Sequence, residues 1–349
     1  MAYSAQKRIT EKARLLDGKG RIAQTGWSPE MLLEYDRSDV AKGRRWRVKE
    51  WDYYLFGNDE WQIALTVADN SYHGLISASV INLKEGWDKT NSYMQFFTNG
   101  KYDMPNNSNF GDVVFRSKNV SVNFNLGTNE RYITFRYKHF DDAKELYVSA
   151  VLTQPKEDSL VIAVPFKENK NAFYYNHKIN CMPVSATVHY GPEVIEFKPE
   201  NTLGCLDWGR GVWPYDNRWV WCSASGFVDG ERFGFNMGTG FGDRTDCGEN
   251  IFYYKGKAYK IGELDISVPK DYKNESWTFI GEDGDVNLRM KPVYERFAAP
   301  GALGIIKSEQ HQVFGKYYGT VTLREEDGSI QRVTIDGLTG FAEDVINKW

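Results

Sequence analysis

The chain of 349 residues is poor in several features that often reveal the class of a protein. Its four cysteines, at positions 181, 205, 222 and 247, include no Cys-x-x-Cys pair, which disfavours a zinc ribbon or a redox motif. No apolar run approaches the about 18 residues that a membrane-spanning helix needs. With a net charge of −4 and no run of Lys and Arg, the sequence offers no basic surface for nucleic acid.

The first residues, MAYSAQKRITEKARLLDG, lack the apolar segment of a signal peptide. We therefore expect a cytoplasmic protein, in which the cysteines are free thiols. The five histidines, at positions 73, 139, 177, 189 and 311, show no metal-ligand spacing, and no Gly-x-Ser-x-Gly motif is present. These absences argue against a metal site and a nucleophilic hydrolase, and the sequence implies no cofactor.

Aromatic residues and glycine are abundant instead, with aromatics at 15% of the chain and 32 glycines. This composition favours β-strands joined by tight turns. Residues 120–126 and 131–137 alternate between apolar and polar side chains, as the strands of an antiparallel hairpin do. Residues 144–166 fit two strands around a polar turn, and 319–337 fit a hairpin that turns at Asp327-Gly328.

Helices are expected at only two places. Residues 28–37 begin with Ser as an N-cap and carry Glu30 in the first turn, and 340–349 could form a second short helix.

The two halves of the chain resemble each other weakly. MQFFTNGKYDM (94–104) is similar to NIFYYKGKAYKI (250–261), and an upstream Trp-led strand at 61–74 aligns with 219–230. Two similar all-β units predict two lipocalin-like antiparallel β-barrels side by side, because closing a sheet removes its exposed edges. We place an N-terminal barrel with its short helix at residues 1–170 and a C-terminal barrel at residues 171–349.

Four stretches of the chain resemble a known family; they are residues 20–40, 45–74, 235–261 and 311–319. Over nearly its full length the chain resembles the bacterial family catalogued as domain of unknown function 2804, which implies no activity. More remotely, it is similar to the lipocalin-like group of carotenoid hydratases, tocopherol cyclases and some Diels–Alder cyclases. That similarity implies an apolar ligand in a cleft, often with an Asp that delivers a proton, and Asp207-Trp208-Gly209 is the short motif in common.

The stretch LDWGRGVWPYDNRWVWCSASG (206–226) mixes Trp with charged residues in a way that no ordinary core strand needs. Alternation places Trp219 and Trp221 on one face of a strand, and we expect that face to line a barrel interior. We expect residues 207–217 to form a loop at the mouth of that barrel, where ligands bind.

Asp207 is the candidate proton donor, because a carboxylate beside Trp loses water and can act as a general acid. The alternative is an ion pair between Asp207 and Arg210 on a loop. The candidate ligand-binding residues of this stretch are Trp208, Arg210, Trp213, Tyr215 and Trp221.

A second cluster is NMGTGFGDRTDCGEN (236–250). Its glycines precede no helix pattern and no Gly-Lys-Ser/Thr, so they predict a bulge or close backbone approach rather than a phosphate loop. Glu249 could orient a substrate or relay a proton, and Asn250 could bind it. An ordinary polar turn is the alternative.

His311 is the third catalytic candidate, since a histidine at a strand end can serve as acid or base. An ordinary hydrogen-bonded histidine is the alternative. Glu50 and Asp52 share one face of a strand and could form an acid–base pair, or they could be neutralised by nearby Arg and Lys.

These residues lead to the hypothesis of an acid–base enzyme, an isomerase, cyclase, hydratase or lyase. It would act on a small apolar or ring-shaped molecule in an aromatic cleft. Because Trp also stacks on sugar rings, a glycan-active enzyme is a further hypothesis. A non-catalytic binding protein for a lipid-like or sugar-like metabolite is the alternative from another class.

Overall fold

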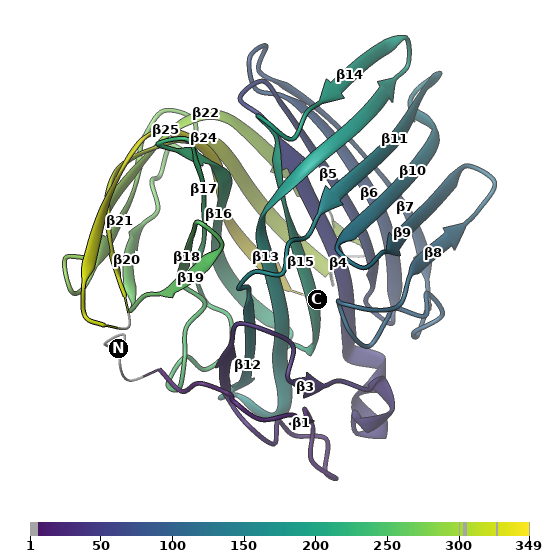
Figure 1. Ribbon diagram of the computed structural model, residues 1–349. Coiled ribbons are helices and arrows are strands. Elements are labelled where there is room, and N and C mark those ends of the chain that lie inside the picture. The colour runs from purple at the N-terminus through teal and green to yellow at the C-terminus, as the bar shows by residue number, and fades with distance from the viewer. Residues whose placement is uncertain (1–5, 300, 303–305, 326, 349) are drawn as a thin grey trace.

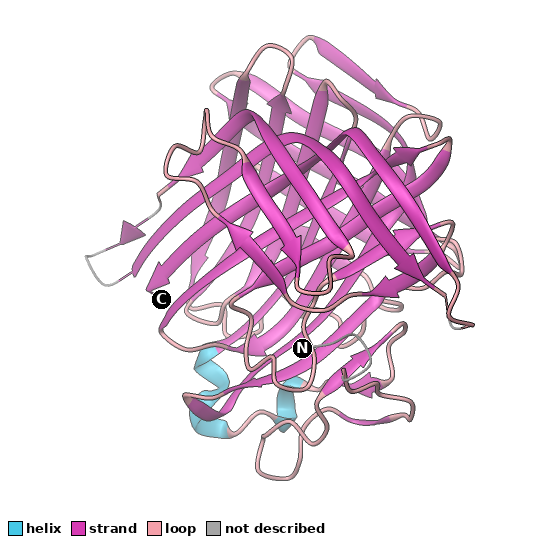
Figure 2. Cartoon of the chain, turned by 90° about the vertical axis from the view of Figure 1, so that its left-hand side faces the viewer, coloured by secondary structure: helices cyan, strands magenta, loops and turns pink. Residues whose placement is uncertain are grey.

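A computed structural model describes residues 6–299, 301–302, 306–325 and 327–348. Strands dominate it, and they form two strongly curved antiparallel sheets that lie side by side (Figure 1). The predicted all-β class with two lipocalin-like units is confirmed. Two short 3-10 segments, η2 (Arg37–Asp39) and η3 (Lys42–Arg47), lie below the sheets (Figure 2).

The first sheet has 13 strands and takes in the N-terminal part of the chain together with a segment beyond its middle. Its main path runs through β7 (Trp87–Phe96), β6 (His73–Asn82), β5 (Trp61–Asp69), β4 (Val48–Gly57), β15 (Leu203–Val212), β13 (Asn169–Tyr190), β11 (Lys144–Thr153), β10 (Glu130–Asp141), β9 (Val120–Leu126) and β8 (Val113–Arg116). Strands β12 (Leu160–Phe166) and β14 (Glu193–Phe197) pair with β13, and β2 (Gly26–Ser28) pairs with β12.

Among the described residues, the second sheet has ten strands. Its path runs through β19 (Lys257–Lys260), β18 (Ile251–Tyr254), β17 (Glu231–Thr239), β16 (Asp216–Val228), β25 (Ile330–Lys348), β24 (Ile306–Arg324), β22 (Val286–Ala298), β21 (Trp277–Gly281) and β20 (Leu264–Ser267), with β23 (Gly301–Ala302) on β24. A separate parallel pair, β1 (Ala13–Arg14) and β3 (Leu33–Glu34), belongs to the N-terminal segment.

Each sheet encloses an apolar core of its own, and a third core lies between the sheets. The first core holds residues such as Phe135 and Trp208, and the second holds Phe235 and Trp277. The third core draws side chains from both sheets, among them Tyr174 and Trp221. The region between the sheets is therefore a packed interface and the place where residues distant in sequence meet.

The predicted hairpins are confirmed. Residues 131–137 of β10 pair with 120–126 of β9, and β24 pairs with β25 on either side of the predicted turn. Residues 144–166 contain β11 and β12 as expected.

Both predicted helices are wrong. In 28–37, Leu33 and Tyr35 are buried at a spacing of two residues, and Ser28 belongs to β2, which extends the first sheet. The 340–348 segment is the end of β25, which alternates its side chains between two cores and pairs with strands on both sides. In both cases tertiary pairing outweighs the local helix signal.

The chain passes from the first sheet to the second at a different point from the predicted domain boundary. Position 170/171 falls inside β13, whose 22 residues all lie in the first sheet. The chain passes from the first sheet to the second between Val212 and Asp216. Lys167 and Glu168 form the turn between β12 and β13, and the polar residues 169–171 already belong to β13.

A bulge in β13 fixes the two sheets against each other. At Cys181 the backbone adopts a φ of 60°, and the register with β15 shifts between Ile179 and Met182. The side-chain amide of Asn180 donates to Ser223 Oγ at 2.9 Å, on β16 of the second sheet. A Cβ on Gly234 would lie 2.5 Å from the Cys181 sulfur, so only glycine permits this close approach.

Replacing Asn180 with Ala should therefore loosen the contact between the sheets. We expect Asn180→Ala to lower the free energy of unfolding by about 1–3 kcal/mol, because its partners on β16 stay buried without a donor. Urea unfolding measures the change. Asn109→Ala, at an exposed position, is the matched control and should stay within about 0.5 kcal/mol of the wild type; an equal effect of both variants would contradict the role of Asn180.

Candidate active site between the two sheets

The alternation predicted for β16 is confirmed, but the face that carries Trp does not line a barrel interior. Val220 and Cys222 point into the second core, inside the curved second sheet. Trp219 and Trp221 pack in the third core and face the first sheet. The aromatic wall therefore belongs to the interface, and the predicted barrel-mouth position is wrong.

Asp207 also faces this interface, from a strand rather than from the predicted loop. It lies in the middle of β15, because Leu206 and Trp208 on either side fill the first core. Gly209 lets the indole of Trp51 lie against β15, since a Cβ there would be 2.0 Å from the ring. Trp51 Nε1 then donates to Asp207 Oδ2 at 3.1 Å.

Strand pairing arranges polar side chains into two rows that face each other across the interface. The first-sheet row consists of Lys178, Asp207 and Tyr53, which are register partners across β13, β15 and β4. The second-sheet row consists of Gly238, Trp221, Glu343, Gln312 and Arg296, which are register partners across β17, β16, β25, β24 and β22.

Lys178 is the charged centre of the site. Its side chain is 2% exposed, and Nζ lies 3.0 Å from Asp207 Oδ1 and 4.0 Å from Glu249 Oε2. Nζ also lies 3.9 Å from the centroid of the Trp221 ring, a cation–π contact with the opposite row. Asn176 donates to Asp207 at 2.6 Å, so donors surround that carboxylate.

Glu249 lies on the other side of Lys178. It follows the glycine-rich loop after β17, and Asn236 Nδ2 donates to its Oε2 at 3.2 Å. Asn236 in turn accepts a hydrogen bond from Trp221 Nε1 at 2.6 Å. Burial raises the pKa of Glu249, and its Oε1 has no hydrogen-bond partner among the described residues. Asp207 and Glu249, both predicted, are thus brought together by Lys178.

Glu343 completes the acidic group. Its Oε1 accepts from Trp219 Nε1 at 3.1 Å, and its Oε2 accepts from Gln312 Nε2 at 3.4 Å. Burial raises the pKa of Glu343 to about 7, and the charge of Asp207 adds to this effect. The residue keeps partial contact with solvent. Near neutral pH, Glu343 can therefore both hold and release a proton.

Aromatic rings close one end of the two rows. Neighbouring ring centroids there lie 5.2–6.3 Å apart, in stacked and edge-on contacts. The rings belong to Trp51, Tyr174, Trp213, Trp219 and Phe241.

A groove of about 790 Å³ adjoins the other end of the rows. Its floor is formed two residues further along the same strands. In the first sheet these floor residues are Cys205 and Leu55, and in the second sheet they are Ser223, Phe341 and Phe314. Asp207, Trp221 and Glu343 lie one side-chain layer beyond this floor and are not part of the groove lining, because the floor side chains pack between the two sheets.

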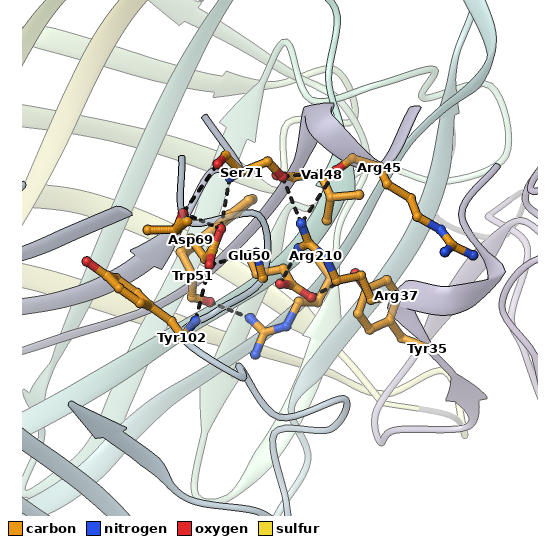
Figure 3. Close-up of polar contacts among 12 residues, drawn as sticks. Tyr35, Arg37, Arg45, Val48, Glu50, Trp51, Asp69, Ser71, Tyr102 and Arg210 are labelled. Atoms are coloured by element: carbon orange, nitrogen blue, oxygen red, sulfur yellow. Dashed lines mark hydrogen bonds and ion pairs between the residues drawn. The ribbon is translucent and has the colours of Figure 1, made fainter. Parts of the chain in front are cut away.

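Arg210 and Trp208 point away from the rows. Arg210 is fully buried and pairs with Asp52 at 3.1 Å, not with Asp207. Its guanidinium carbon lies 4.1 Å from the centroid of the Trp208 ring, in the first core. Figure 3 shows Arg210 near Glu50 and Trp51.

Three further candidates also lie outside the rows. His311 contacts Glu295 at 2.6 Å and stacks on Tyr272 with ring centroids 4.0 Å apart, on the face of β24 opposite to Gln312. Asn250 bonds backbone groups of Gly238 and Gly262. Tyr215 is 45% exposed in the turn between β15 and β16.

The other candidate motifs have structural roles. Glu50 pairs with Arg37 at 2.5 Å and Asp52 pairs with Arg210, so the alternative of neutralised carboxylates holds for both. At Gly240 a Cβ would lie 2.3 Å from the carbonyl oxygen of Arg218, which confirms a close backbone approach.

The four cysteines are free and buried. Within the described ranges, no three potential ligands gather into a metal site, and no helix has the length and apolar character needed to cross a membrane.

Lys178 and Glu343 were missed by sequence reasoning. Lys178 stands shortly after the boundary predicted at 170/171, and Glu343 lies in a segment interpreted as a helix. The alternation of Phe341, Glu343 and Val345 is the signal that could have placed Glu343 on the same face as an aromatic residue.

The sequence profile for domain of unknown function 2804 (DUF2804) matches residues 6–349. The chain belongs to this family. No curated protein sequence matches the chain significantly. The resemblance noted in the sequence is therefore confirmed for the family.

Solved structures show the same fold at low sequence identity. Kievitone hydratase from Nectria haematococca has a TM-score of 0.52 at 11% identity, over 96% of this chain and 98% of the hydratase chain. A candidate AttH protein from Nitrosomonas europaea has a TM-score of 0.53 at 14% identity, over 91% of this chain and 98% of the other. The remote similarity to a lipocalin-like hydratase is thus shown at the level of the fold.

Removing the buried ammonium should destabilise the protein strongly. We expect Lys178→Met to lower the free energy of unfolding by about 3–5 kcal/mol, because Asp207 and Glu249 lose their shared countercharge. The double variant Lys178→Met/Asp207→Asn should recover part of this loss, since it removes one uncompensated charge. Denaturant unfolding of the single and the double variant measures the coupling between Lys178 and Asp207. Equal free energies of unfolding for these two variants would contradict the pairing.

Glu343 should make stability depend on pH. Its pKa is about 7 in the folded protein and near 4.5 in the unfolded chain, so the folded state binds more protons between these values. The free energy of unfolding should therefore fall as pH rises from about 4.5 to 7, by about 1–3 kcal/mol.

In the matched variant Glu343→Gln, the side chain at position 343 does not titrate. Its free energy of unfolding should therefore not show this fall between pH 4.5 and 7. The difference in unfolding free energy between the variant and the wild type should grow over the same pH range. A difference that stays constant from pH 4.5 to 8 would show that the carboxyl of Glu343 has an ordinary pKa.

Proposed function

We propose that the chain is an acid–base enzyme that acts on a small apolar or ring-shaped substrate between the two sheets. One observation carries the proposal: Lys178 holds Asp207 and Glu249 together against the Trp221 ring, and Glu343 is the register partner of Trp221 in the facing row. Buried ionisable groups of this kind are costly to maintain, and they concentrate at functional sites. The structural likeness to kievitone hydratase agrees with such chemistry.

Glu343 is the better proton donor of the site. Its pKa of about 7 leaves it partly protonated at neutral pH, and its partial exposure allows a substrate to reach it. Asp207 was the donor expected from the sequence. Its oxygens contact the donors of Lys178, Trp51 and Asn176, and we assign it the role of proton acceptor instead.

For a hydration, the steps balance as follows. The Glu343 carboxyl donates its proton to one carbon of a C=C bond, and the oxygen of a water molecule bonds to the other carbon. The Asp207 carboxylate accepts the proton that this water releases. Elimination is the same sequence in reverse, while an isomerisation replaces water with the loss of a C–H proton to Asp207.

The surrounding groups support these transfers. Lys178 and Trp51 hold the Asp207 carboxylate in place. The ring of Tyr53, whose centroid lies 5.8 Å from that of Trp221, can stabilise positive charge that develops on the substrate, while a face of Trp221 is occupied by Lys178. Glu249, on the far side of Lys178, is placed to balance the charge of the ammonium when Asp207 becomes protonated.

Proton exchange at carbon tests the proposal without a known substrate, because isomerases, cyclases, hydratases and lyases all move protons to or from carbon. A metabolite extract of the source organism is incubated with the protein in D₂O and analysed by mass spectrometry. We expect at least one compound to gain deuterium with the wild type, and the rate to fall about 100-fold or more with Glu343→Gln.

Glu309→Gln is the matched control, because Glu309 is an exposed carboxylate on β24 beside His311. It should leave the exchange unchanged. A compound that binds but never exchanges would instead identify a non-catalytic binding protein. Equal exchange by wild type and Glu343→Gln would reject Glu343 as the donor.

A further inference from the structure

Charge is unevenly distributed along the chain. Residues 6–47 contain eleven Lys and Arg but six Asp and Glu, a net charge of +5, whereas the whole chain carries −4. The excess is spread over this segment without a run of Lys and Arg. Its last part, with η2 and η3, lies at the lower end of the molecule in both views (Figure 1, Figure 2). A positive end on a negatively charged protein favours contact between that end and an anionic surface.

Strand pairing brings three segments to this end of the first sheet. β4 begins directly after η3, and Glu50 near its start pairs with Asp69 at the end of β5. β6 begins at His73, which pairs with Phe96 at the end of β7. η3, the turn between β5 and β6 and the loop after β7 therefore share one edge of the sheet.

Hydrogen bonds join these segments into one surface. The Ser71 hydroxyl, in the turn between β5 and β6, donates to the carbonyl oxygen of Arg45 in η3 at 3.0 Å (Figure 3). The backbone N–H of Asn99, in the loop after β7, donates to the carbonyl oxygen of Ser71 at 2.8 Å. Arg47 donates to the carbonyl oxygen of Trp213 at 3.0 Å, so the turn between β15 and β16 adjoins η3 as well.

Aromatic side chains on this surface are exposed to solvent. Trp46 is 54% exposed, Phe96 is 62% exposed and Phe97 is 70% exposed. The backbone at Phe97 has a φ of 57°, a conformation that is rare for a bulky residue. Tyr215, in the turn that Arg47 contacts, is exposed as well. Rings gathered at one end of a protein in this way mark an interaction surface.

Cationic side chains accompany these rings. η3 supplies Lys42, Arg44, Arg45 and Arg47, and the loop after β7 supplies the exposed Lys101. The guanidinium carbon of Arg47 lies 5.3 Å from the centroid of the ring of Trp46, the residue before it. Lys and Arg side chains of this kind lay their apolar stems along a surface and direct the charge toward anionic groups.

The carboxylates of the same segments do not balance these cations. Asp39 lies 2.5 Å from Arg14, and Glu50 lies 2.5 Å from Arg37, so each has a cationic partner of its own. Asp69 is fully buried. The carboxylates that reach solvent are Asp36 and Asp103, fewer than the cations of η3 alone.

We propose that this end of the molecule docks on a membrane that contains anionic phospholipids. Trp46, Phe96 and Phe97 enter the headgroup region, while the Lys and Arg side chains of η3 contact lipid phosphates. A bilayer accounts for the rings as well as the charges, because all three rings are more than half exposed and would lose this contact with water. The assignment does not depend on the proposed function, although docking would bring an apolar molecule near the turn that joins the two sheets.

Sedimentation of the full chain with lipid vesicles tests the proposal. Vesicles of phosphatidylglycerol and phosphatidylcholine in equal parts are compared with vesicles of phosphatidylcholine alone. At low salt we expect the protein to bind the anionic vesicles about tenfold or more tightly than the neutral vesicles. High salt should remove most of this difference, because it screens the charges. Equal affinity for both kinds of vesicle, or binding to neither, would overturn the proposal.

Charge reversal shows whether this surface, rather than net charge, binds the vesicles. Lys42→Glu/Arg44→Glu should weaken binding to the anionic vesicles about 30-fold or more. Lys118→Glu/Lys138→Glu is the matched control, because it changes the net charge equally at exposed positions. These two lysines lie where β13 ends, whereas η3 lies where β13 begins. The control should bind as the wild type does, and an equal loss in both variants would contradict the assignment of this surface.

Removing the rings tests the apolar part of the contact. Trp46→Ser/Phe97→Ser should weaken binding about tenfold at low salt, and the binding that remains should disappear at high salt. Ile280→Ser/Ile330→Ser, at two exposed positions of the second sheet, is the matched control and should leave binding unchanged. Unaltered binding by Trp46→Ser/Phe97→Ser would overturn insertion of the rings. Urea unfolding confirms that each variant is folded.

A nucleic acid is the competing partner for a surface with cations and aromatic rings. A short RNA is therefore added to the protein with the anionic vesicles. We expect the protein to stay on the vesicles. Release of the protein by the RNA, with RNA binding also lost in Lys42→Glu/Arg44→Glu, would assign this surface to nucleic acid and overturn the membrane proposal.

Discussion

A single buried ammonium group constrains the arrangement of the two sheets. The side chain of Lys178 is almost fully removed from water, so its charge must be balanced within the protein. One balancing carboxylate, Asp207, comes from the neighbouring strand of the same sheet, while the other, Glu249, comes from the second sheet's loop. The face of Trp221 covers the remaining side. The charge is satisfied only when the sheets meet in one register, which the bulge at Cys181, three residues along the chain, helps to fix.

The same constraint explains why the ionisable groups of the site differ in character although they lie close together. Asp207 is surrounded by donors, Glu249 is buried with one oxygen without a partner among the described residues, and Glu343 keeps some contact with solvent. Strand register determines the surroundings of Asp207 and Glu343, since each occupies a fixed place in its row, whereas the loop after β17 places Glu249. The chemistry proposed for the site uses these differences, because proton transfer needs a donor and an acceptor whose environments are unlike.

Sequence patterns predicted individual strands better than they predicted which strands and side chains those strands contact. Alternation placed Trp219 and Trp221 on one face of a strand, and the hairpin of 120–137 formed as expected. The alternation does not indicate which surface packs against that face, because both sheets have apolar surfaces that could cover it. Asp207 and Glu249 were selected for their neighbours in sequence, yet they meet only through Lys178, which pairing of β13 with β15 supplies. Arg210 points to the opposite face of β15 from Asp207, because side chains three residues apart on a strand lie on opposite faces.

The position of β25 in the second sheet sets an order for assembly. This strand lies between β16 and β24 in the middle of the sheet, although it follows the other strands of the sheet in the chain. During synthesis β16 to β24 emerge without the strand that joins them, so the two halves of the sheet have an open seam. Glu343 arrives on that strand and reaches Trp219, some 120 residues earlier, only when the seam closes. Until β25 pairs, β16 and β24 each lack the neighbour that they have in the folded sheet, and Glu343 lacks its contact with Trp219.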